Sequence, residues 1–232
     1  MLGGSRLVVS AMDSRKCQTS TASPAEPGDL PTGLGDAVNG HMTLLRTEDG
    51  GETWTPATTL PPALENEGAF AASGTAVAVG PNGHAWFATG GAATARVYRS
   101  TDWGRSWQAA PTPIRHDAPA SGIFSIAFSD AKHGVIVGGK HDAPADPSDN
   151  IAITEDGGAT WQAPKQRPGG YRSAILLTKT LFIATGPAGT DISKDNGKTW
   201  LPIEHGFHAL SQGGKTIWAS GNNGAVAKLQ NP

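Results

Sequence analysis

The sequence predicts an all-β fold built from repeated four-stranded antiparallel units. One eight-residue pattern occurs four times and reads Ser/Thr, any residue, Asp, any residue, Gly, any residue, Ser/Thr and Trp. Short apolar runs precede and follow each copy, as expected of β-strands. The 31 Gly and 17 Pro among 232 residues indicate many turns. Because self-similarity of this kind is typical of repeat architectures, we interpret the chain as a series of similar β-units.

The residue types of the repeat suit a turn between two strands. An Asp followed two residues later by Gly favours a tight turn, in which the carboxylate accepts backbone N–H groups and Gly supplies a positive φ. The Trp then opens the next strand and offers an apolar face to a neighbouring sheet. This pattern is the Asp-box, or BNR repeat. We therefore interpret its aspartates as turn residues and not as metal ligands or acid/base groups. The aspartates and tryptophans are Asp49, Asp102, Asp156, Asp195, Trp54, Trp107, Trp161 and Trp200.

The segments between the repeats align with one another. Each unit opens with Gly and an apolar residue, a second strand follows, a third runs into the Asp-box, and a fourth begins at its Trp. The openings are Gly68, Gly122, Gly170 and Gly206. Four short strands in about 40–50 residues describe a blade of a β-propeller. We expect full blades at 67–110, 121–164 and 170–204, with a partial one before them and another, 206–229, after them.

The blades predict a propeller of five blades over residues 34–232, and the alternative is an incomplete ring from a longer propeller. Residues 1–33 are expected to be irregular. Residues 13–33 are rich in Ser, Thr, Pro, Gly and Asp, and their apolar residues follow neither the 2-residue period of a strand nor the 3.6-residue period of a helix. Residues 6–10 are the exception and read as a strand that would close the last blade.

Composition excludes several classes of protein. A net charge of −2 with 16% charged residues argues against nucleic-acid binding. The single Cys17 excludes an internal disulfide and a multi-cysteine metal site. No apolar run approaches the ~18 residues of a membrane span. No signal-peptide core is present, which favours the cytoplasm, or a secreted or periplasmic protein if a leader was omitted. No phosphate loop or dinucleotide fingerprint occurs, so neither a nucleotide nor a haem is expected.

Residues 34–230, with their Asp-boxes and connecting strands, resemble bacterial Asp-box propellers. They are similar to photosystem II stability and assembly factors and to BNR glycosyl-hydrolase-like proteins. Sialidases of this group resemble one another by an arginine triad and a tyrosine nucleophile in the channel. Here Arg172 is the one arginine at an aligned channel position. Tyr98 belongs to an outer strand, and Tyr171 should point to the opposite side of its strand from Arg172. The resemblance therefore does not imply a sialidase.

Propeller topology predicts where a site would lie. The Asp-box turns lie on one face, and the blade-to-blade loops and second-to-third-strand loops lie on the other. The pentapeptide His-Asp-Ala-Pro-Ala occurs twice on that second face, at 116–120 and 141–145. Its residues His116, Asp117, His141 and Asp142 are candidate ligands for Ca²⁺ or Zn²⁺. The alternative is a pair of polar loops whose side chains meet only solvent.

Four further residues are candidate catalytic groups near the same mouth. Arg172 would clamp an anion or oxyanion, or form an ion pair with Asp191. His208 would act as a general base, or as a hydrogen-bonded packing residue. Glu67 and Asp191 are the plausible pair of acids for a glycosidase.

Two functions follow from these residues. The first is a hydrolase acting on a small cyclic ester (a lactone) or a sugar at the channel mouth, assisted by a divalent cation. The second is a non-catalytic module that holds a protein partner on a propeller face. The expected partner is thus a small-molecule substrate or a protein.

Overall fold

The computed structural model describes residues 18–20, 32–47, 52–57, 59–70, 74–203, 205–214 and 216–229. These residues form five antiparallel sheets and two short 3-10 turns, and no α-helix occurs among them. None of the described residues forms a helix long and apolar enough to cross a membrane.

The first two sheets have four strands each and follow the chain from strand to strand. The first sheet contains β1 (Gln18–Ser20), β2 (Thr32–Val38), β3 (His41–Arg46) and β4 (Thr55–Pro56). The second contains β5 (Val77–Val79), β6 (Ala85–Ala88), β7 (Arg96–Ser100) and β8 (Gln108–Pro111). The 3-10 turn η2 (Pro81–Gly83) joins β5 to β6.

The remaining three sheets repeat the same order. The third contains β9 (Ser121–Phe128), β10 (Gly134–Lys140) and β11 (Ile151–Thr154). The fourth contains β12 (Ala174–Leu177), β13 (Phe182–Gly186), β14 (Gly189–Ser193) and β15 (Leu201–Ile203). The fifth contains β16 (Ala209–Gly213), β17 (Thr216–Ser220) and β18 (Val226–Leu229), with η3 (Asn222–Gly224) before β18. A single bridge between Ile153 and Gln162 stands where the third sheet would have its fourth strand.

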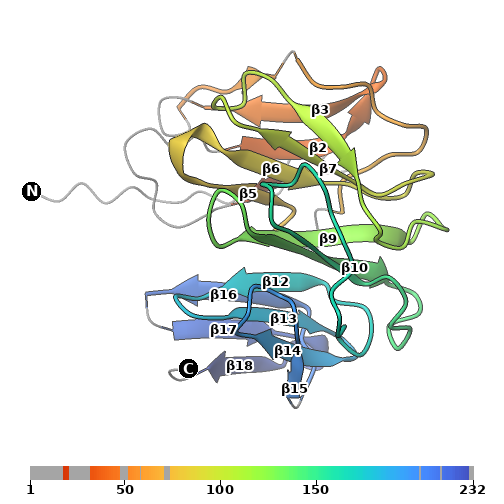
Figure 1. The fold of residues 1–232 in the computed structure, drawn as a ribbon, viewed down its shortest axis with the longest axis vertical. Helices are drawn as coiled ribbons and strands as arrows, with labels where there is room; N and C mark the ends of the chain where they lie inside the picture. Colours follow the sequence, from red (N-terminus) through yellow and green to blue (C-terminus); the bar gives the residue numbers. More distant parts are fainter. Residues whose placement is uncertain are drawn as a thin grey trace, which may run out of the picture.

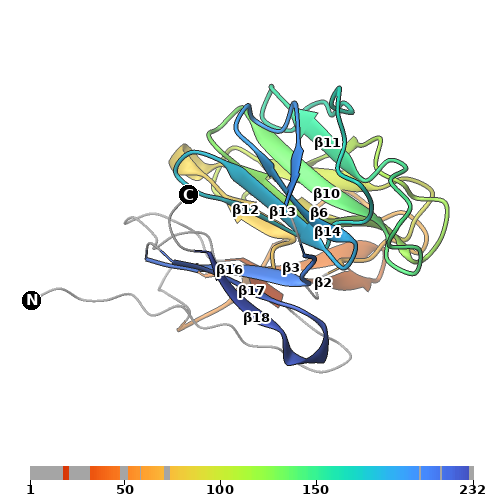
Figure 2. The same ribbon diagram turned by 90° about the horizontal axis from the view of Figure 1, so that it is seen from below.

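The five sheets stack in chain order along a curved row, with the first and fifth sheets at its two ends (Figures 1 and 2). Apolar side chains fill each space between neighbouring sheets. Strand β10 contributes alternate side chains to the apolar cores on both of its faces. Ile136 packs toward the second sheet, while Val135 and Val137 pack toward the fourth. Alternation along a strand that is buried on both faces therefore produces a nearly continuous apolar run.

The Asp-box turns have the hydrogen bonds that their residue types predict. At Asp102, Oδ1 accepts the N–H groups of Arg105 (3.0 Å) and Ser106 (2.9 Å), and Oδ2 accepts the Ser106 hydroxyl (2.5 Å). Asp156 and Asp195 hold their turns in the same way. These contacts are the ones expected of turn residues at all three positions. Asp49 lies outside the described residues.

Each Asp-box tryptophan in the second, third and fourth sheets packs against the preceding sheet. Trp107 lies in the core between the first and second sheets, Trp161 between the second and third, and Trp200 between the third and fourth. Trp54 directly precedes β4 of the first sheet in the described part of the chain, and its side chain is exposed. The repeat therefore joins a turn to an inter-sheet contact.

The prediction of an all-β fold with four-stranded antiparallel blades is confirmed, whereas the number of blades in a complete ring stays a prediction. Two details of the strand assignment were wrong. The first strands of three units were expected to start at Gly68, Gly170 and Gly206. The structure has them start later, at Val77 (β5), Ala174 (β12) and Ala209 (β16). At these openings the backbone meets the neighbouring unit instead of its own sheet: Gly68 forms a single bridge to Gly90, and a Cβ at Gly206 would come within 2.7 Å of the Pro187 carbonyl.

The second wrong detail concerns residues 13–33, which were expected to carry no strand. Strand β1 lies within them and pairs with β2, which itself begins at Thr32. A three-residue strand of polar side chains has no periodic signal of its own and is defined by its partner. The candidate closing strand at residues 6–10 lies outside the described residues.

Candidate functional site

The candidate site lies at the ends of the strands opposite the Asp-box turns. Strand β10 runs from Gly134, which pairs with the Asp-box residue Thr154, to Lys140, which pairs with Ser121. The two His-Asp-Ala-Pro-Ala segments flank the Lys140 end, and the His141 N–H donates to the Ala120 carbonyl (3.2 Å). Both copies thus rise side by side from one end of the third sheet, as predicted. We call residues 112–120 and 141–150 the rim.

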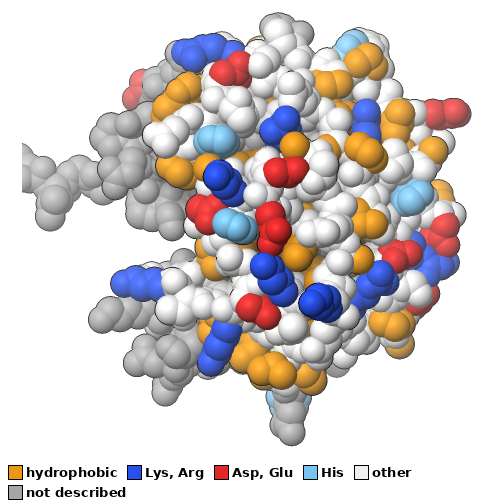
Figure 3. Space-filling model, in the orientation of Figure 1, with side chains coloured by type: hydrophobic (Ala, Val, Ile, Leu, Met, Phe, Trp, Pro, Cys, Tyr) orange, Lys and Arg blue, Asp and Glu red, His pale blue; other side chains and the backbone are white. Residues whose placement is uncertain are grey.

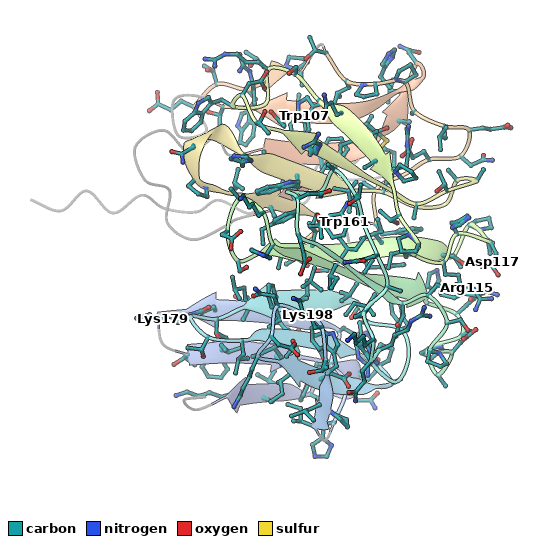
Figure 4. The ribbon with its side chains drawn as sticks, in the orientation of Figure 1. Trp107, Arg115, Asp117, Trp161, Lys179 and Lys198 are labelled. Carbon is teal, nitrogen blue, oxygen red and sulfur yellow. The ribbon has the colours of Figure 1, made fainter. Side chains whose placement is uncertain are left out.

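Figure 4 shows the separation directly, because Arg115 and Asp117 lie at one edge of the molecule, away from Trp107 and Trp161. Acidic and basic side chains crowd the same edge in Figure 3. The backbone also joins the two rim loops, since the Arg115 N–H donates to the Asp149 carbonyl (2.8 Å). The rim is therefore one connected polar surface.

Glu67 is buried in an ion pair and is not available as a catalytic acid. Its side chain accepts Arg96 Nε (2.9 Å) and Arg96 Nη2, the Thr89 hydroxyl (2.6 Å) and the Leu64 N–H (2.8 Å). Burial alone would raise the pKa of Glu67, but the hydrogen bonds from Arg96, Thr89 and Leu64 outweigh it and lower that pKa. A general acid needs the opposite shift. The catalytic role predicted for Glu67 is therefore not supported by its surroundings.

Arg172 and Asp191 neutralise each other in the interior. Arg172 donates from Nε (2.8 Å) and Nη2 (2.5 Å) to Asp191 Oδ2, and from Nη1 to the Tyr171 carbonyl (3.1 Å). Each residue is only 2% exposed. Of the two readings offered for Arg172, the structure shows the ion pair and not an anion clamp. Asp191 is likewise held by Arg172 in the interior.

The four predicted metal ligands do not converge. Among the described residues, no group of three or more His, Cys, Asp or Glu side chains is placed to hold a metal ion. Asp117 pairs with Arg115 (2.7 Å), Asp142 lies 3.7 Å from Lys140, and His116 Nδ1 lies 2.8 Å from the Ile114 carbonyl. The His141 ring lies nearly perpendicular to the Phe124 ring, with the centroids 6.1 Å apart. Binding of a divalent cation stays a prediction without support from this geometry.

His208 lies apart from the other candidates, at the start of the fifth sheet. Its Nε2 lies 2.7 Å from Asn222 Oδ1, and its side chain is exposed. Its carbonyl accepts the Ser173 hydroxyl (2.7 Å). A hydrogen-bonded structural histidine describes these contacts better than a general base.

Sequence reasoning missed the arginines that organise the rim. Arg115 holds Asp117 through two nitrogens, at 2.8 and 2.7 Å, and also pairs with Asp146. The hydrogen bonds from Arg115 lower the pKa of Asp117 well below its usual range. Arg167 pairs with Asp149 (2.9 Å) at the end of the second loop. The available signal was the pair of opposite charges two positions apart, Arg115 and Asp117.

The comparisons with known proteins point to the same architecture. No established protein-family profile matches the chain. A xyloglucanase from Paenibacillus sp. is 28% identical over 165 residues, which span 64% of this chain and 16% of that protein. The chain thus covers about a sixth of the length of this curated relative.

Two solved structures superpose on nearly the whole chain. The structure of YCF48 bound to D1 peptide matches with a TM-score of 0.57 and 18% identity, over 96% of this chain and 69% of that one. An ancestral GH74 enzyme matches with a TM-score of 0.54 and 19% identity, over 92% of this chain and 29% of that one. At these identities the likeness shows the fold and not the activity. The chain therefore has a β-propeller fold, and its resemblance to Asp-box propellers is confirmed at that level.

Proposed function

We propose that this chain is a non-catalytic binding module that holds an extended polypeptide on its rim. The observation that carries the proposal is the state of the two candidate acids. Glu67 and Asp191 are each buried and each held by an arginine. Glycoside hydrolysis needs two carboxyl groups flanking an open cleft, about 5–9.5 Å apart, with one of them protonated near neutral pH. Neither residue meets these requirements.

The ion pairs of the rim can be replaced by contacts with a bound protein. Its charges are paired in ion pairs open to solvent on at least one side, formed by half-buried Arg115 with Asp117 and Asp146, and by exposed Arg167 with Asp149. Exposed pairs contribute little to stability, roughly 0–1 kcal/mol each. A partner can therefore replace them at small cost, and complementary charge then sets the orientation and rate of binding. A polypeptide offers both signs of charge and backbone groups to such a surface. YCF48, which has the same fold, is known in a complex with a peptide.

The second candidate is hydrolysis of a sugar, which the sequence likeness to a xyloglucanase favours. It would need an acid pair other than Glu67 and Asp191, because those two are occupied. The xyloglucanase, YCF48 and the ancestral GH74 enzyme are not named for action on a cyclic ester, so they give the lactone substrate no support.

The rim is tested by charge reversal at Arg115. Immobilised synthetic peptides of acidic, basic, apolar and proline-containing classes are probed with the unmodified chain and with Arg115→Glu. We expect one class to bind, and Arg115→Glu to weaken that binding at least tenfold. The change frees Asp117 and Asp146 from their partner and places like charges beside them. Amide chemical shifts should locate the bound peptide at the rim.

The matched control is Lys198→Glu. Lys198 forms an exposed ion pair with Glu155 (2.9 Å) between two neighbouring Asp-boxes, and it lies away from Arg115 and Asp117 in Figure 4. This variant should bind like the unmodified chain. Equal loss in both variants would reveal a general effect of net charge, and binding of no peptide class would contradict the proposal.

A further inference from the structure

The ion pairs of the rim turn their acids outward. In the described part of the chain, four ion pairs involve an acid of the rim: Arg115 with Asp117 and with Asp146, Lys140 with Asp142, and Arg167 with Asp149. In each pair the acid is more exposed than the cation, as for Arg115 and Asp117 at 22% and 56%. Lys198 and Glu155, away from the rim, have the opposite order, at 54% and 47%. A molecule that approaches the rim therefore meets carboxylates first.

Negative charge is also concentrated on the rim. Residues 112–120 and 141–150 contain four Asp and one Arg, which gives a charge of −3 with His neutral. The whole chain carries −2, so all its other residues together carry +1. Because complementary charge sets the orientation and rate of association, this distribution favours a cationic partner at the rim.

The second rim loop has hydrogen-bond acceptors that its own donors leave unfilled. Asp142 lies 3.7 Å from the Lys140 ammonium, and its carboxylate has no hydrogen bond to a described residue. Asp149 accepts Arg167 at Oδ1 (2.9 Å), while its Oδ2 has no such bond. At the base of the loop, Asn150 is 0% exposed and donates to two backbone carbonyls, but its Oδ1 has no partner among the described residues. Arg and Lys side chains carry N–H donors and no acceptor, and so complement this surplus.

We propose that the partner of the rim is a basic, extended polypeptide whose Arg side chains bind Asp142 and Asp149. This inference rests on the proposed binding of a polypeptide at the rim, and it names the chemical class of that polypeptide. Arg suits the site better than Lys, because a guanidinium donates to both oxygens of a carboxylate at once. The recessed cations Lys140 and Arg167 lie on the inner side of these acids and leave the outer side to the partner.

Four synthetic nine-residue peptides test the charge class. All share the same Ser and Thr residues, and each carries three Arg, three Lys, three Glu or three Gln at alternate positions. Binding to the full chain near pH 7 is followed by fluorescence anisotropy, and amide chemical shifts locate the bound peptide. We expect the Arg peptide to bind about tenfold tighter than the Glu and Gln peptides, and its affinity to fall as salt is raised. The Lys peptide should bind more weakly than the Arg peptide.

Asp142→Asn combined with Asp149→Asn removes two outward charges with little change of shape. Asp142 has no hydrogen bond to lose, and Asn tolerates the positive φ of 46° at residue 149. This double variant should bind the Arg peptide about tenfold more weakly than the unmodified chain. Arg115→Glu is unsuited to this test, because it adds negative charge and removes the contact between the two loops at once.

The matched control is Asp130→Asn combined with Glu155→Gln. These acids have similar exposure, 52% and 47%, and the same change in net charge results. They lie at the opposite end of the third sheet, since Asp130 is in the turn from β9 to β10 and Glu155 follows β11. The control should bind the Arg peptide within about twofold of the unmodified chain.

The results separate this inference from the proposed function. Binding of the Glu or Gln peptide at the rim, without the Arg peptide, would overturn the basic partner and leave the rim as a binding surface. Unchanged binding of the Arg peptide by the Asp142 and Asp149 double variant would do the same. Equal loss in the control would reduce the effect to net charge and also overturn the inference. If no peptide shifts the rim amides, both proposals are contradicted.

Discussion

The Asp102 carboxylate illustrates how a single side chain stabilises a turn in this protein. Burial would raise its pKa, but hydrogen bonds from the Ser106 hydroxyl, the Ser106 N–H and the Ser100 hydroxyl outweigh burial and lower it from 3.8 to about 2. A pKa that is lower in the folded state stabilises the fold above pH 3.8, and this stabilisation is lost as the pH falls toward 2.

We therefore predict that Asp102→Asn lowers the free energy of unfolding by about 1 kcal/mol at pH 7, a value reduced for solvent screening of this half-exposed group. The difference from the unmodified chain should shrink as the pH falls through 4 and vanish near pH 2. Urea unfolding at a series of pH values measures it. A difference that stays constant with pH would contradict the role assigned to the carboxylate.

The buried pair of Glu67 and Arg96 leads to a second prediction at this scale. Arg96→Met leaves the Glu67 carboxylate buried without its cation, and breaking such a pair costs about 3–5 kcal/mol. Arg99→Met on the same strand is the control. Arg99 makes an exposed hydrogen bond to Gln108 (2.6 Å), and its loss should change stability by roughly 0.5 kcal/mol or less. Chemical denaturation compares the two, and similar losses would contradict a structural role for the Glu67 pair.

At the scale of elements, the close passage of segments between neighbouring blades depends on glycine. Gly90 forms isolated bridges to both Gly68 and Gly122. A Cβ at Gly90 would lie 2.6 Å from the Gly122 Cα and would also meet the Phe70 ring. Backbone cannot move as a flexible side chain does, so the added methyl group must push two blades apart.

Gly90→Ala should therefore destabilise the protein by about 1–3 kcal/mol, as overpacking does. Gly213→Ala on β16 is the control, because a Cβ there would meet nothing within 4 Å. That substitution should be neutral or slightly stabilising. Thermal unfolding of both variants gives the comparison, and a stable Gly90→Ala protein would show that the two blades do not approach as described.

Elements were predictable to the extent that their signals are local. The Asp-box residues fix each turn through contacts within five positions, as at Asp156 and Thr160. The apolar runs at 135–137 and 182–184 are also local signals, and both lie in strands as predicted. Strand β1 was missed because its three polar residues pair only through β2. The starts of β5, β12 and β16 were misplaced because a Gly-apolar pair does not reveal whether the segment joins a ladder.

At the scale of the whole molecule, the sequence predicted which end of the blades carries the polar loops but not what their side chains contact. Topology alone places both His-Asp-Ala-Pro-Ala segments at one end of β9 and β10. Pairing depends on distances between blades, which the repeat does not encode. The sequence therefore does not reveal whether a charged residue is catalytic or structural. Burial and partners decide it for the pair of Arg172 with Asp191 and for the pair of Glu67 with Arg96.

We propose that the buried acids Glu67 and Asp191 are structural and that the protein binds without catalysis. The most direct measurement is hydrolysis of xyloglucan and of a panel of aryl glycosides by the purified chain, alongside Asp191→Asn and Glu67→Gln. We predict no turnover above the uncatalysed rate for the unmodified chain, and loss of stability in both variants. Turnover by the unmodified chain that either substitution abolishes in a folded variant would contradict the claim.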